Sequence, residues 1–207
     1  MGKVADLFIL NILCLICCIP IVTAGASITA MFYVTMKMVK NEEAYIIKSF
    51  FKSFKQNFKQ ATVINLIMLV LAVILYVDMS IVKQMGQPLG QIMNIIFLAF
   101  SVLYVMVFLY IYPVLAKFYN STRNTFINAV LMSVRHLPYT VLMAAVCACP
   151  IILVSFAPTF RMQATIALIC LVIGGAVGGY CNSFFLDKIF QNYIPEDAEN
   201  PDGGKAE

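Results

Sequence analysis

The chain has 207 residues, of which 62% are hydrophobic and only 12% are charged, and its formal net charge is +4. About a quarter of the residues in soluble domains are charged, so this composition excludes a soluble globular protein and indicates an integral membrane protein. The lysines cluster beside apolar segments, which makes the positive charge a topology signal rather than a sign of nucleic-acid binding. We therefore expect an all-α, polytopic transmembrane helix bundle, with residues 1–193 forming a single membrane domain.

The first apolar segment, residues 7–36, is longer than the roughly 20 residues that cross the hydrocarbon core. Pro20 removes a backbone donor and Gly25 permits a bend, so the segment must change direction. Two structures remain open: one kinked helix that crosses once, giving five spans, or two short helices in a hairpin that returns to the same side, giving six. We favour the single span, because only about a dozen residues separate Gly25 from Lys37, too few for a second crossing.

Residues 42–60 sort into stripes when they are placed at 100° per residue on a helix. The lysine stripe contains Lys48, Lys52, Lys55 and Lys59, and the stripe beside it contains Ile47, Phe51, Phe54 and Phe58. Adjacent lysine and aromatic stripes are typical of a helix in a membrane interface. The pattern predicts a helix lying flat on the cytoplasmic surface, the side on which short loops accumulate lysine.

The remaining apolar segments predict four spans, over residues 61–77, 92–115, 137–158 and 163–186. Most lysines and arginines then fall on one side, which places the C-terminus in the cytoplasm of a cell-membrane protein. Residues 194–207 are acidic, rich in proline and glycine and without apolar periodicity, and we expect them to form a disordered tail.

Small residues are spaced four apart in the last predicted span. The two overlapping pairs are formed by Gly174, Gly175, Gly178 and Gly179. Small residues at this spacing let helix backbones approach closely in a membrane. They predict close packing, either inside the bundle or between the protomers of a homo-oligomer.

Four asparagines lie within or beside the predicted spans: Asn11, Asn65, Asn94 and Asn182. Amide groups are costly in hydrocarbon unless they form hydrogen bonds between helices. They could form a polar pocket for a hydroxyl-rich solute or join helices to one another. We favour the second interpretation, because no buried carboxylate or base accompanies them. The single histidine, His136, is expected to cap a helix near lipid phosphates.

No pattern for catalysis, cofactor binding or metal binding occurs in the sequence. It contains no paired carboxylates on one helix face, no nucleophile with a suitably spaced base and no zinc motif. Cys14 and Cys17 have a CxxC spacing, but no nearby histidine or carboxylate completes a site, so we interpret them as small packing residues. We expect a protein that is not an enzyme and needs no cofactor.

The lysine and aromatic stripes allow two interpretations of their partner. The lysines could hold the helix on the anionic lipids of the inner leaflet, or they could dock a soluble protein, as a cytoplasmic helix between spans does in importer permeases. We favour lipid anchoring. Both interpretations depend on the same field of positive charge.

Several stretches resemble the YesL-like family of bacterial membrane proteins, whose function is unknown. They are PIVTAGAS at residues 20–27, FFKSFKQNF at 50–58, YPVLAKF at 112–118, and the segment from Asn128-Ala129 to His136-Leu137-Pro138. The resemblance implies a multi-pass protein of the cell membrane with a part in carbohydrate uptake, beside sugar ABC importer components. It supplies no ligand or catalytic residue.

These observations lead to three functional hypotheses. The first is a non-enzymatic protein accessory to carbohydrate (oligosaccharide) uptake, which follows from the resemblance. The second is a small-solute transporter in its own right, and the third is a structural membrane scaffold. A transporter requires a polar path through the bundle, whereas an accessory protein requires a surface for its partner.

Overall fold

The computed structural model describes residues 2–42, 45–86 and 88–193, and the predicted acidic tail, residues 194–207, lies outside them. The described residues are almost entirely helical and contain no β-strand. Five helical segments among them are long and apolar enough to cross a membrane: Ile21–Val39, Ile46–Val82, Leu89–Lys117, Leu137–Phe156 and Phe160–Gln191. The predicted all-α, polytopic fold is confirmed.

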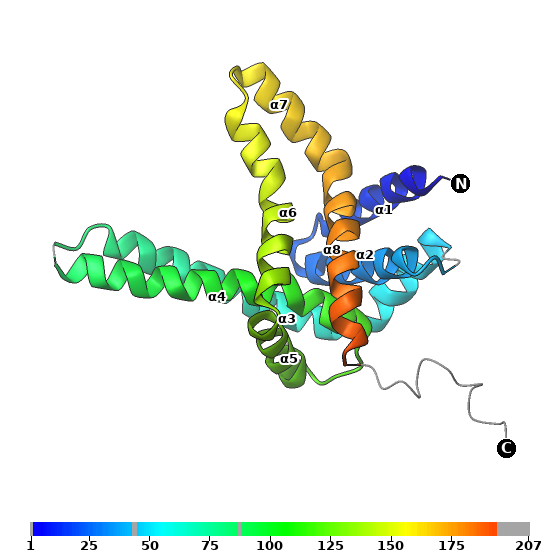
Figure 1. Ribbon diagram of the computed structural model, residues 1–207, viewed down its shortest axis with the longest axis horizontal. Helices are drawn as coiled ribbons and strands as arrows, with labels where there is room; N and C mark the ends of the chain where they lie inside the picture. The colour runs from blue at the N-terminus through cyan, green and yellow to red at the C-terminus, as the bar shows by residue number, and fades with distance from the viewer. Residues whose placement is uncertain (1, 43–44, 87, 194–207) are drawn as a thin grey trace.

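The N-terminal apolar segment forms two helices that run side by side in opposite directions (Figure 1). α1 (Lys3–Cys18) is followed by a 3₁₀ turn, η1 (Ile21–Thr23), and then by α2 (Ala24–Val39). The prediction of one kinked helix over residues 7–36 is therefore wrong. The segment has the two-helix form of the hairpin alternative, and of its two helices only α2, with η1, belongs to the five segments long and apolar enough to cross a membrane. The chain reverses at Pro20, which has an extended backbone (φ −76°, ψ 119°) and lacks the N–H that would continue α1.

Hydrogen bonds join the two helices of this hairpin from its turn to its open end. The Ser27 hydroxyl on α2 donates to the Cys14 carbonyl on α1 at 2.9 Å. At the open end, the Lys3 ammonium donates to the Asn41 side-chain carbonyl at 2.9 Å. The N-terminus of α1 therefore lies beside the C-terminus of α2, on the same side of the molecule.

The predicted interfacial helix and the span after it form one helix. α3 (Ile46–Val82) continues through residue 60 without interruption, pairs with α4 (Leu89–Lys117), and extends with it from the body of the molecule as an arm (Figure 1). The prediction of a helix over residues 42–60 that is separate from a span at 61–77 is wrong, because both belong to α3. The junction FKQATV contains neither glycine nor proline, so nothing there breaks the helix. At 1.5 Å per residue, α3 is about 55 Å long.

The segment between the predicted spans at residues 92–115 and 137–158 forms a helix of its own. α5 (Thr122–Arg135) begins after Ser121, whose hydroxyl accepts a hydrogen bond from the Asn124 N–H at 3.4 Å. Sequence reasoning missed it because the segment is much more polar than a membrane span. α5 packs mainly on α4.

The C-terminal part forms a second long hairpin. α6 (Leu137–Phe156) is followed by α7 (Phe160–Ile169), a π-helical segment η2 (Cys170–Gly174) and α8 (Gly175–Gln191). Figure 1 shows that the α6–α7 arm and the α3–α4 arm extend from the body in different directions. Most side chains on both arms are exposed and apolar, as expected of surfaces that face lipid.

The core lies where α2 contacts α1, α3, α4 and α8. Two of the four glycines predicted for close packing contact the N-terminal hairpin, and of these Gly179 is buried and Gly175 is exposed. A Cβ atom added at Gly175 would lie 2.7 Å from the Asn11 side-chain oxygen, and one at Gly179 would lie 2.9 Å from the Met31 methyl group. Gly174 and Gly178 are not packed in this way, and a Cβ at Gly178 would meet nothing within 4 Å. α8 therefore approaches the N-terminal hairpin through one of the two pairs, Gly175 and Gly179, and not through the other.

Candidate functional site

Four lysines form an exposed row on the first half of α3, which we call the lysine row: Lys48, Lys52, Lys55 and Lys59. The buried face of the same half-helix contains Phe50, Ser53 and Ala61, which contact the core. Since the buried face is fixed, the lysine row must point away from the protein. None of the four forms an ion pair within the described ranges.

The aromatic stripe beside the lysine row is divided between surface and core. Phe51 and Phe58 are 39% and 36% exposed, whereas Phe54 packs against the core. The ring of Phe50, which the predicted stripes left out, is fully buried and stacks on Phe54 with the ring centroids 6.1 Å apart. Two phenyl rings therefore accompany the lysines on the surface, while two others attach this half of α3 to the protein.

The continuity of α3 determines where the lysine row can lie. Lys48 precedes Lys59 by eleven residues, which is about 16 Å along the helix axis. The headgroup layer on one side of a bilayer is only about 5–7 Å thick. If the apolar half of α3 crosses the membrane, Lys59 reaches the headgroups and Lys48 and Lys52 extend into water. In that orientation the lysine row is too long to lie within the headgroup layer.

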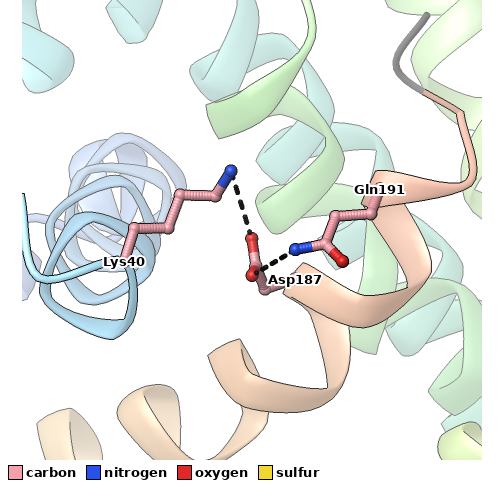
Figure 2. Close-up of polar contacts among 3 residues, drawn as sticks. All are labelled: Lys40, Asp187 and Gln191. Atoms are coloured by element: carbon pink, nitrogen blue, oxygen red, sulfur yellow. Dashed lines mark hydrogen bonds and ion pairs between the residues drawn. The ribbon is translucent and has the colours of Figure 1, made fainter. Parts of the chain in front are cut away.

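An ion pair connects the N-terminal hairpin to the last helix (Figure 2). The Lys40 ammonium, just after α2, lies 3.7 Å from a carboxylate oxygen of Asp187 on α8, and the Gln191 amide donates to the other oxygen at 3.0 Å. The Lys40 and Asp187 side chains are 23% and 17% exposed. A partly buried pair between residues far apart in sequence fixes α8 relative to α2.

We expect a measurable coupling energy between Lys40 and Asp187. In a cycle of Lys40→Gln, Asp187→Asn and the double variant, the coupling free energy should be about 1 kcal/mol, the upper end of the range for exposed pairs, because both side chains are mostly buried. The cycle can be followed by unfolding of helices in detergent micelles on addition of dodecyl sulfate.

The nearby pair of Lys37 and Glu42 provides a matched control. Its charged atoms are slightly closer, at 3.6 Å, but its side chains are 32% and 49% exposed. We expect a smaller coupling there, because solvent screens exposed charges. An equal or larger coupling for Lys37 and Glu42 would show that burial does not strengthen the contact between α2 and α8.

The four asparagines are not brought together. The Asn11 amide on α1 donates to the carbonyls of Leu171 and Val172 in η2, and its oxygen accepts from the Ala176 N–H at 2.9 Å. Its side chain thereby forms hydrogen bonds with backbone groups at the place where the π-helical segment interrupts the regular α-helical hydrogen bonds. Asn11 joins two helices rather than lining a pocket.

Two more asparagines also join helices. Asn65 on α3 donates to the Ile21 carbonyl at 2.8 Å and accepts from the Tyr112 hydroxyl at 3.0 Å. Asn182 on α8 donates to Cys147 Sγ on α6 at 3.3 Å. Asn94 is exposed near the far end of α4. The predicted alternative of one polar pocket formed by all four is therefore wrong, and the helix-joining interpretation describes three of them.

Sequence reasoning missed a groove beside α5, because it did not predict that helix. The groove has a volume of about 530 Å³ and is lined by Phe118, Asn120, Asn128, Leu131, Met132, Val134, Arg135 and Tyr193. We call it the α5 groove. His136, predicted to be a helix cap, lies between α5 and α6, and its Nε2 is 3.1 Å from the Tyr193 hydroxyl.

Comparison with known proteins gives one family match. Residues 7–79 match a family model described as "Protein of unknown function, DUF624". No curated protein and no solved structure matches the chain. The matched region covers the N-terminal hairpin and most of α3, including the lysine row. The chain is thus similar over this region to a family of unknown function.

Proposed function

We propose that the protein is a non-enzymatic, multi-pass component of the cell membrane, accessory to carbohydrate uptake, which docks a cytoplasmic importer subunit on the lysine row. The observation that carries the proposal is the rigid continuity of this row with an apolar helix. A partner bound to the exposed half of α3 would be held at a fixed distance from the membrane. Exposed phenyl rings beside cations suit a protein interface, where aromatic residues are enriched.

The contact pattern and the charges support a cytoplasmic location for the lysine row. The Lys40–Asp187 pair and the contact between the Phe118 and Phe190 rings bring the inner ends of α2, α4 and α8 together. Lys83 and Arg161 lie at the tips of the two arms. By the positive-inside rule, the end with more lysine and arginine faces the cytoplasm, so both termini would lie there.

The hypothesis of a transporter in its own right receives less support. Asn11 and Asn65, two candidates for a polar path, are engaged in contacts between helices. Two grooves along the arms, one between α3, α4 and α5 and one between α4 and α6, are lined almost entirely by apolar residues. The role in carbohydrate uptake itself derives from the resemblance to the YesL-like family.

A quadruple Lys→Gln variant at Lys48, Lys52, Lys55 and Lys59 tests the docking surface. We expect it to lose a sugar-importer subunit that copurifies with the native chain in mild detergent, because long-range steering and the interface contacts both need the positive charge. The quadruple Lys→Arg variant keeps the charge and should retain the subunit. The measurement is mass spectrometry of the purified complex.

The outcomes distinguish the hypotheses. Retention of the importer subunit by the Gln variant would contradict docking on the lysine row. A deletion strain with intact importer genes should grow poorly on one glycan. Normal growth on every polysaccharide tested would remove the role in carbohydrate uptake and leave the scaffold hypothesis.

A further inference from the structure

The α5 groove combines a polar end with an apolar wall. Asn120, Asn128, Arg135 and Tyr193 supply its polar groups, and none of its lining residues is acidic. Its volume of about 530 Å³ falls within the range of small-molecule sites, which are mostly apolar with a few placed polar groups. The groove therefore suits a ligand with both an anionic and a hydrocarbon part.

Contacts with Tyr193, which follows α8, position the Arg135 side chain in the groove. The guanidinium carbon of Arg135 lies 5.8 Å from the centre of the Tyr193 ring, a cation–π distance. The Tyr193 ring is held in turn by His136, through the 3.1 Å contact of its hydroxyl and an edge-to-face ring contact at 5.9 Å. Arg135 forms no ion pair within the described part of the chain. Its N–H groups are thus oriented without being neutralised.

The apolar wall continues onto the outer face of α5. Leu131 and Val134, which line the groove, are 61% and 51% exposed, and Ile127 and Val130 extend the same surface along the helix. The opposite face of α5 is buried through Thr125, Ala129 and Met132. An apolar surface of this kind, ending at an arginine, matches the acyl chains and phosphate of one lipid.

We infer that the α5 groove binds an anionic phospholipid of the surrounding membrane, with its phosphate at Arg135 and an acyl chain along Leu131 and Val134. Arg and phosphate form charge-assisted, bidentate hydrogen bonds, and the amides of Asn120 and Asn128 can donate to the remaining headgroup oxygens. The site is separate from the lysine row and does not depend on the proposed partner.

The absence of tryptophan from the chain allows a direct test. A single tryptophan introduced by Val134→Trp in the full chain reports lipid at the groove through quenching by brominated acyl chains in phosphatidylcholine vesicles. We expect brominated phosphatidylglycerol to quench its fluorescence about fivefold more effectively than brominated phosphatidylcholine. This is the gain in affinity that one cation gives for an anionic headgroup. The matched reporter Ile151→Trp, on the 69% exposed surface of α6, should show little preference.

Two arginine variants distinguish a specific lipid site at Arg135 from a general effect of positive surface charge. Arg135→Gln should abolish the preference at the Val134→Trp reporter, whereas Arg123→Gln, an exposed arginine on the same helix, should leave most of it. Equal quenching by the two lipids, or equal losses in both arginine variants, would overturn the inference. If inorganic phosphate abolished the preference for phosphatidylglycerol, the groove would bind free phosphate rather than a lipid headgroup, and the inference would be overturned.

The carboxylates that follow Tyr193 in the sequence provide a further check. Glu196→Gln combined with Asp197→Asn removes two negative charges close in sequence to the groove, and the preference for phosphatidylglycerol should stay the same or rise. A preference found only in this double variant would overturn the inference for the native chain.

Discussion

Replacing Gly25 by alanine is expected to lower the free energy of unfolding by about 1–3 kcal/mol, the usual cost of forcing extra volume into a packed core. A Cβ atom at this position would lie 2.7 Å from both the Ala61 carbonyl oxygen and the Asn65 Cβ, and 3.2 Å from the Tyr112 ring. The first of these is backbone and cannot rotate away, so α2 would have to move off α3. Unfolding in detergent micelles with added dodecyl sulfate, followed by loss of helical circular dichroism, measures the change.

Gly178→Ala is the matched control for this substitution. Both glycines are helical, but a Cβ at Gly178 meets nothing within 4 Å. Alanine has the higher helix propensity, so this variant should be as stable as the native chain or slightly more stable. If the two variants lost the same stability, close packing between α2 and α3 would not be the reason for glycine at position 25.

The second large effect is expected from Asn11→Leu. The side chain of Asn11 is 2% exposed and satisfies two carbonyls and one N–H of the last helix. Leucine fills similar space but can form none of these bonds, and each buried polar group left without a partner costs about 1–3 kcal/mol. We therefore expect an overall loss of about 2–4 kcal/mol, measured by the same unfolding experiment.

Asn94→Leu provides the comparison for Asn11, because it makes the same chemical change at an exposed site on α4. It should leave stability nearly unchanged, or raise it in a lipid environment. Asn11→Asp, which loses the amide donors and places a buried carboxylate against the Leu171 and Val172 carbonyls, should be no more stable than the leucine variant. A stable Asn11→Leu protein would mean that the π-helical segment does not need α1 to satisfy its backbone.

These two sites explain how the short N-terminal hairpin is held. α2 contacts α3 closely through Gly25, and α1 is fastened to η2 and α8 through Asn11. Helix association in membranes depends on such close packing and hydrogen bonding, because lipid is as apolar as the helix surface. The hairpin therefore belongs to the body of the molecule rather than standing as an independent anchor.

The long α3 helix changes the interpretation of the lysine row. The pattern of Lys48 to Lys59 depends only on helical period, and the structure keeps these side chains on one exposed face. The orientation of that face relative to the membrane depends on whether the helix bends at residue 60. Because α3 does not break there, the row extends along the axis of the following apolar helix.

Several features followed from the amino-acid sequence alone. Composition and hydropathy determined the membrane class, the helical fold and the approximate positions of the spans after residue 60, since these depend on local apolar content and helical period. The sequence also identified Pro20 and Gly25 as the place where the first segment changes direction. It predicted the exposed lysine face for the same reason.

Only the tertiary structure decided which contacts those helices make. The hairpin of α1 and α2 depends on contacts such as Ser27 with Cys14, and the roles of Asn11 and Asp187 depend on partners more than a hundred residues away in sequence. The sequence did not reveal α5, because a polar, amphipathic helix lacks the high hydropathy of a membrane span. Local pattern fixes the face that a helix can bury, whereas the identity of the partner is set by the packing of the whole chain.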